Sequence, residues 1–155
     1  MLSKYYLALF NPRSWNDFLN FGARIYGTTS SKIPRAKTIQ IGDYLICYIS
    51  RRALFVGILE IESEYYFDKT PIWQDAMFPV RFKVKPVILL PIESGLPFKK
   101  IKNDLEIFRK LENKSAWGAF FINSLNRFDI ADGEYLHREL RLKSENREIP
   151  KRYRF

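Results

Sequence analysis

The stretch YLICYISRRALFVGILEI, residues 44–61, decides the fold of this chain. Its two apolar runs, YLICYI and LFVGILEI, are rich in β-branched and aromatic residues, and this composition favours two strands. The basic pair Arg51 and Arg52 lies between the runs, so the stretch predicts a β-hairpin with a basic tip. Gly57, inside the second run, indicates either a bulge or the close approach of another backbone.

On the N-terminal side of the hairpin, the apolar run YYLALF at residues 5–10 ends in an Asn-Pro pair. This pattern predicts a buried strand followed by a turn. Ser14 with Asp17 three residues later is typical of a helix start, and a short helix is expected to follow. The polar, basic stretch 24–38 is rich in Ser and Thr and is expected to form a loop, or a loop with one short turn.

On the C-terminal side, apolar and basic residues alternate along 80–85, which predicts a half-buried strand with a basic outer face. The strand continues past Pro86, which indicates an edge strand or a bulge there. Apolar residues follow a helical period over 98–111, and Asp132 is expected to cap a final helix. The order of elements predicts an α+β fold, with a curved mixed sheet or partly closed barrel flanked by helices.

Length and composition are those of one folded domain, which we place at residues 1–143, with a basic tail or linker at 144–155. No apolar run approaches the roughly 20 residues of a membrane span, and no signal-peptide pattern is present, so a cytoplasmic protein is expected. Cys47 and His137 are the only cysteine and histidine. They exclude a disulfide framework and argue against a zinc site or a histidine-based triad. No cofactor is predicted.

The net charge of +9 is unevenly distributed along the chain. Residues 1–55 carry a net charge of +6, residues 56–137 carry −1, and residues 138–155 carry +4. A basic excess confined to two segments predicts a surface patch that faces a polyanion. A merely solubilising surface is the alternative.

No enzyme signature is present, and the chain is predicted not to be an enzyme. Glu60, Glu62 and Glu64 alternate and are expected on one strand face, where they could hold a metal for phosphodiester cleavage. A solvated strand face is the commoner origin of such a pattern. The informative aromatics lie outside the core periodicity, at Tyr26, Trp73 and Phe78. Loop aromatics beside basic residues are what base stacking requires, although they could also cap the ends of the core.

Five segments resemble successive blocks of the EVE domain: YYLALFNPRSW, IQIGDYLICYI, FVGILEIESEYYFDKTPIW, RFKVKPVIL and LPFKKIKNDLEIFRKLENKSAWGAFF. They occur in the family's order, and the resemblance covers residues 4–136. It implies a PUA-like fold related to the YTH domain, whose aromatic cage holds a methylated adenine. The segment WQDAMFPVRFKVK, residues 73–85, is similar to the part of YTH domains that bears the cage.

The resemblance implies where the cage would lie. Its walls fall on Tyr26, where the families usually have Trp, on Trp73, and on Phe78 or Met77. Asn11 matches a polar position that contacts the base edge. Gly27 stands where YTH domains commonly have Ser, so the missing hydroxyl could come from Thr28. The basic residues expected to hold phosphates are Arg24, Lys32, Arg35, Lys37, Arg51, Arg52, Arg81 and Lys83.

The expected function is recognition of a modified base that is flipped or single-stranded, with methylation as the expected modification. The partner is nucleic acid, with DNA favoured and RNA possible, and no membrane is involved. EVE-like domains also occur in McrB-type modification-dependent restriction factors, so fusion to or association with a nucleotide-driven restriction motor is expected. The alternative is a PUA-type RNA-binding accessory domain that recognises no modified base.

Overall fold

The predicted hairpin forms the centre of the sheet. A computed structural model describes residues 2–110 and 114–147 of the chain. Strands β3 (Tyr44–Ile49) and β4 (Leu54–Ile61) pair antiparallel, and β1 (Tyr5–Phe10) pairs parallel to β3. The register shifts where Cys47 lies opposite Gly57, and a Cβ atom at Gly57 would lie 2.6 Å from the Ile88 carbonyl oxygen. Both expectations for this glycine, a bulge and a close backbone approach, are confirmed.

Strand β6 (Val80–Leu89) joins the two parts of the curled sheet. Its second half pairs with β4, and its first half pairs with β2 (Ile25–Thr28) and β5 (Tyr66–Phe67). The main strand order is β1-β3-β4-β6-β2, and β7 (Leu96–Pro97) adds to β4. Pro86 lies at a bulge, where the register between β4 and β6 shifts, and in the half of β6 that pairs with β4 alone. The expectation of an edge strand or a bulge at this proline is therefore confirmed.

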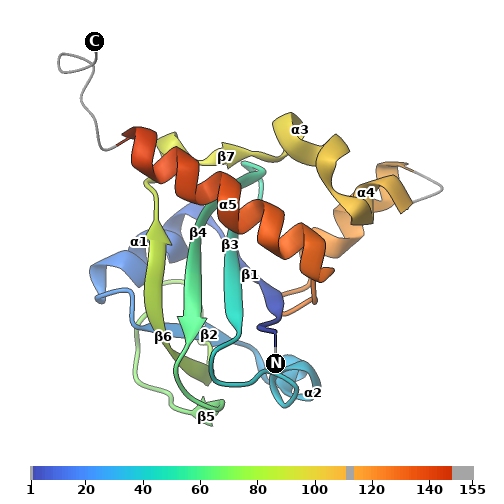
Figure 1. Ribbon diagram of the computed structural model, residues 1–155. Helices are drawn as coiled ribbons and strands as arrows, with labels where there is room; N and C mark the ends of the chain where they lie inside the picture. The colour runs from blue at the N-terminus through green and yellow to red at the C-terminus, as the bar shows by residue number, and fades with distance from the viewer. Residues whose placement is uncertain (1, 111–113, 148–155) are drawn as a thin grey trace.

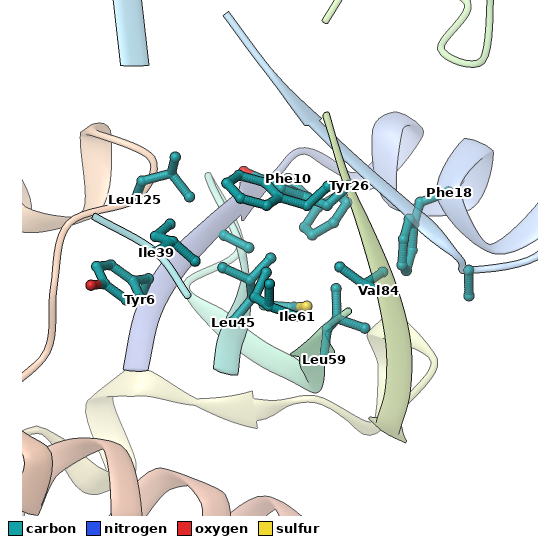
Figure 2. Packing of buried hydrophobic residues seen from close by; sticks show 14 of the residues in the cluster. Tyr6, Phe10, Phe18, Tyr26, Ile39, Leu45, Leu59, Ile61, Val84 and Leu125 are labelled. Atoms are coloured by element: carbon teal, nitrogen blue, oxygen red, sulfur yellow. The ribbon is translucent and has the colours of Figure 1, made fainter. Parts of the chain in front are cut away.

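Two apolar clusters cover the two faces of the sheet. One contains Tyr6, Phe10, Leu45 and Leu59 and packs against α1 (Pro12–Asn20) and α2 (Ile33–Ala36). Figure 2 shows part of this cluster, with Tyr26 beside Phe10. The other cluster packs against α5 (Ile130–Arg147), which crosses the front of the sheet while α1 lies behind it (Figure 1). The fold is therefore a curled half-barrel with flanking helices, as predicted.

Helix α1 begins three residues earlier than the sequence pattern indicated. Asn11, and not Ser14, is its N-cap, since the Asn11 Oδ1 accepts a hydrogen bond from the Ser14 backbone N–H at 2.8 Å. The Ser14 hydroxyl in turn accepts from the Asn11 backbone N–H at 3.0 Å. Pro12 occupies the first helical position, where its missing N–H costs nothing. Ser14 is thus the N3 residue of α1 and forms a capping box with Asn11.

The C-terminal third is more broken than its helical period predicted. It contains the short helices η2 (Ile92–Ser94), α3 (Phe98–Ile101), η3 (Lys102–Asp104), α4 (Glu106–Lys110) and η4 (Lys114–Ile122). Asp132 lies inside the first turn of α5, and its carboxylate accepts the backbone N–H groups of Glu106 and Ile107, at 2.6 and 3.0 Å. It therefore caps α4, and the expectation that it caps the final helix is wrong.

Helix α5 extends to Arg147, so the first four residues of the expected tail, 144–147, are helical. Residues 148–155 lie outside the described residues. Among the helices that the structure does describe, none has the length and apolar character needed to cross a bilayer.

Candidate functional site

A pocket of about 260 Å³ lies where the two end strands of the sheet, β1 and β2, face each other. The end of β1, the start of α1, β2, the 3₁₀ turn η1 (Ser30–Lys32), the β3–β4 tip and the segment after η4 all contribute to it. Its lining combines hydroxyl and amide groups with apolar and aromatic side chains. The lining residues are Leu9, Phe10, Asn11, Ser14, Tyr26, Gly27, Thr28, Thr29, Lys32, Ser50, Phe78, Ile122 and Ser124.

Five of the predicted site residues meet in this pocket: Asn11, Tyr26, Thr28, Lys32 and Phe78. They come from three stretches that are far apart in the sequence, at residues 11, 26–32 and 78. The capping interaction holds the Asn11 side chain through its Oδ1, and its Nδ2 amide makes no hydrogen bond to the described residues. Asn11 therefore has free donors at the pocket mouth.

Tyr26 lies in strand β2, so the expectation of a loop over 24–38 is wrong for this part. Its side chain is only 1% exposed and packs edge-to-face against Phe10, with ring centroids 5.4 Å apart. Its hydroxyl is hydrogen-bonded to the Ser124 hydroxyl, and burial raises the pKa of the phenol well above its usual value. Tyr26 forms the buried floor of the pocket and presents no open ring face.

Trp73 is buried, at 6% exposure, and does not line the pocket, so the expectation of an open stacking face is wrong. Its ring packs edge-to-face against Phe78 at 5.1 Å, and the tip of the indole lies over Gly27. The next residue, Gln74, donates its backbone N–H to the buried Asp17 carboxylate at 3.0 Å, which ties this segment to α1. Phe78 is half-buried and forms one aromatic wall, while Met77 is 46% exposed and lies outside the lining.

Arg81 was expected on a basic outer face, and that expectation is wrong because the side chain is fully buried. Its guanidinium lies 5.3 Å from the Trp73 ring centroid and donates to the carbonyl oxygens of Phe78, at 3.0 Å, and Thr70. It also lies 3.6 Å from an Asp68 carboxylate oxygen. Arg81 holds the 68–78 segment against the sheet and is not available to a phosphate.

The remaining basic residues divide into two groups. Lys32 lines the pocket, Arg35 donates to the Ser124 carbonyl oxygen at 3.3 Å, and the exposed Arg51 and Arg52 directly follow pocket residue Ser50. Burial, and the neighbouring Arg35 charge, lower the pKa of Lys32. The other group lies away from the pocket. Arg24 pairs with Glu62 at 3.7 Å, and Lys83 lies opposite Ile25 in the pairing of β2 with β6. Lys37 lines a different hollow, to which Glu64 also contributes.

In the sequence, several pocket residues carried no signal of a binding site: Ser14, Thr29, Ser50, Ile122 and Ser124. They are ordinary polar or apolar residues, and only the tertiary fold brings them together. The acidic ladder expected on one strand does not form, because β4 ends at Ile61, before Glu62 and Glu64. In the part of the chain that the structure describes, no three His, Cys, Asp or Glu side chains are grouped as a metal site would require.

The curled half-barrel with flanking helices, and with a pocket between its end strands, is of the PUA-like class of folds. Within that class, the chain belongs to the EVE domain family, whose model matches residues 4–125. A UPF0310 protein of Pyrococcus abyssi is 23% identical over 143 residues, which cover 84% of this chain and 94% of the relative.

Solved structures of YTH domains have the same fold. The YTH domain of the Zygosaccharomyces rouxii MRB1 protein, in complex with N6-methyladenosine RNA, gives a TM-score of 0.66 at 14% identity, over 89% of this chain and 86% of that chain. The Mmi1 YTH domain in complex with RNA gives a TM-score of 0.68 at 13% identity, over 94% of this chain and 82% of that chain. The Pho92 YTH domain in complex with m6A gives a TM-score of 0.65 at 18% identity, over 89% of this chain and 83% of that chain.

Proposed function

We propose that this protein is a nucleic-acid-binding module that holds one modified base in the pocket between β1 and β2. The observation that carries the proposal is the size and lining of that pocket. At about 260 Å³ it lies just below the usual range of ligand sites, about 300–1,000 Å³, and suits a single base more than a whole nucleotide. A base can stack on the aromatic wall of this pocket. It can also accept hydrogen bonds from the Asn11 amide, whose Nδ2 makes none to the described residues.

The relatives support the choice of ligand. Two of the YTH domains that share this fold are in complex with N6-methyladenosine RNA or m6A. A modified base is therefore the first ligand to test for binding to this protein.

Each pocket residue has a distinct proposed role. Phe78 supplies the ring face on which the base stacks, and Tyr26 closes the floor. The Asn11 amide and the Thr28 hydroxyl contact the base edge. Trp73 lies behind Phe78 and sets the position of this wall without touching the base.

Discrimination between modified and unmodified bases has a physical limit. One buried methyl group contributes about 0.8 kcal/mol, or roughly fourfold in affinity. Greater selectivity requires pocket polar groups that an unmodified base leaves unpaired. The Asn11 amide, whose Nδ2 makes no hydrogen bond within the described chain, is the group best placed to supply it.

The cations around the pocket would hold the phosphates. We assign this role to Lys32, Arg35, Arg51 and Arg52, which lie on the pocket wall or next to it. Phosphate contacts release counterions, so affinity should fall steeply as salt rises. Charge reversal at Arg51 and Arg52 should weaken binding to all sequences about equally.

The test is equilibrium binding to matched oligonucleotides, DNA and RNA, with and without a methylated base. Phe78→Ala should weaken binding of the preferred oligonucleotide by about 1–3 kcal/mol, since it removes the stacking face. Phe21→Ala is the matched control, because Phe21 is a 51% exposed phenylalanine at the opposite end of α1 from Asn11. Equal losses in the two variants, or an affinity that does not change with salt, would contradict the proposal.

The same assay separates the finer alternatives. A preference for DNA, and association with a restriction motor, are our predictions for the chain's context, and the paired DNA and RNA arms test the first of them. Equal affinity for modified and unmodified RNA would favour the alternative function, a PUA-type RNA-binding accessory domain.

A further inference from the structure

We propose that Ile122 is a wedge that enters the base stack when the pocket takes a base, so that the substrate is a duplex from which the base is flipped. This inference rests on the proposed function and names its substrate class. Ile122 is 72% exposed, yet it belongs to the pocket lining together with Phe78 and Tyr26. An apolar side chain thus projects into solvent at the mouth of a base-sized pocket.

The three residues that follow Ile122 are bonded to the pocket wall and to strand β1. The Asn123 Oδ1 accepts from the Lys32 Nζ at 3.0 Å, and the Ser124 hydroxyl is bonded to the Tyr26 hydroxyl. Leu125 then donates its backbone N–H to the Leu7 carbonyl oxygen at 2.6 Å. Isoleucine is also stiff at χ1 because it is branched at Cβ. Ile122 therefore has a fixed position relative to the pocket, as a side chain that displaces a base requires.

The neighbouring charges fit the same geometry. Lys32 and Arg35 each bond to one of the two residues that follow Ile122. An apolar side chain beside cations can lie between bases while the cations contact the flanking phosphates. Exposed apolar residues are common singly on protein surfaces, and Ile41 is 66% exposed in a different hollow. Ile122 differs from it in lining the proposed base pocket.

A flipped base leaves a gap in the duplex, and proteins that distort DNA fill such gaps with apolar side chains. A single strand has no partner strand and no continuous stack to repair. The side chain of Ile122 should therefore contribute to duplex binding and contribute little to binding of a single strand.

The experiment compares Ile122→Ser with the wild-type protein on a duplex and on a single strand that carry the same methylated base. We expect about a tenfold loss of affinity for the duplex and less than a twofold change for the single strand. Ile122→Leu should retain duplex binding, and Ile41→Ser, a matched exposed isoleucine, should change neither. A fluorescent adenine analogue next to the methylated base should brighten when the wild-type protein flips that base and unstacks its neighbour, and less so with Ile122→Ser.

The outcomes separate this inference from the function on which it rests. Wild-type binding to the methylated single strand but not to the duplex overturns the wedge and leaves the base-binding function intact. Equal losses on duplex and single strand also overturn the wedge, since they make Ile122 an ordinary pocket contact. Absence of binding to every nucleic acid overturns both proposals. Thermal melts of each variant show whether it is folded.

Discussion

Replacement of Gly27 by alanine tests the central feature of the site, the contact between Trp73 and strand β2. A Cβ atom at position 27 would lie 2.4 Å from the Trp73 Cη2 and 2.8 Å from the Phe78 Cβ, whereas ordinary contacts begin at 3.4 Å. The indole tip must therefore retreat by about 1 Å. It cannot do so freely, because the Arg81 guanidinium and the Phe78 ring pack against it.

The expected cost follows from these contacts. Overpacking of this kind costs about 1–3 kcal/mol, and the removal of a glycine from a strand returns about 0.5–1 kcal/mol. We therefore expect Gly27→Ala to lower the free energy of unfolding by about 1–2 kcal/mol. The tryptophan emission should change as well, because Trp73 becomes more exposed. Denaturant titration followed by fluorescence measures both quantities, and Trp73→Phe identifies the Trp73 contribution to the emission.

Gly118→Ala is the matched control, since within the described residues no atom apart from its chain neighbours and its own helix lies within 4 Å of the Cβ position at this glycine of η4. It should be neutral or slightly stabilising, because glycine is unfavourable in helical segments. If Gly27→Ala is as stable as this control and leaves the emission unchanged, Trp73 does not lie on Gly27. The account of the aromatic wall would then be wrong.

Three further predictions concern other parts of the molecule. Incubation with DNA or RNA and Mg²⁺ or Mn²⁺ should give no cleavage on gels, and cleavage that disappears in Glu62→Gln would overturn the binding-only function. Burial, and then the nearby Arg141 charge, lower the pKa of His137, so the unfolded chain binds more protons and stability should fall as pH drops below about 6.5. Thermal melts at about pH 7.5 and pH 5 should show a smaller fall for His137→Gln than for the wild type. Asp132→Ala should cost about 1–2 kcal/mol, as for a lost helix cap, because its carboxylate accepts two backbone N–H groups at the start of α4, at 2.6 and 3.0 Å. Denaturant titration measures that cost, and nucleic-acid binding should not change.

The sheet could be predicted from the sequence because its signals are local. The runs of the β3–β4 hairpin are apolar and β-branched, and a glycine and a proline mark the two bulges at Gly57 and Pro86. Each of these residue patterns determines the structure of the few residues that contain it. The helices of the C-terminal third were harder to predict, because α4 takes its cap from Asp132, which lies 25 or more residues further along the chain.

The site was only partly predictable, since its geometry depends on which face another segment covers. The alternation of side chains along β6 predicts that Arg81 lies on the opposite face of the strand from Phe82, and it does. The segment from Asp68 to Phe78 then folds over that outer face and buries it. The same event turns Trp73 from a free stacking surface into a packed one. No local pattern in a single sequence shows that a loop will cover a strand.

The position of the pocket follows from how the sheet ends. A sheet that curls but does not close leaves unpaired backbone groups on its outer strands, and proteins commonly cover such edges. Here the segment 125–128 covers β1: Leu125 and Phe128 donate backbone N–H groups to β1, and Asn126 accepts one from Leu7. Covering that edge brings Ser124 onto the Tyr26 hydroxyl and leaves Ile122 at the pocket mouth. Protection of the edge and construction of the pocket wall are thus one structural event. Substitutions that loosen the 125–128 pairing should therefore weaken binding before they unfold the domain.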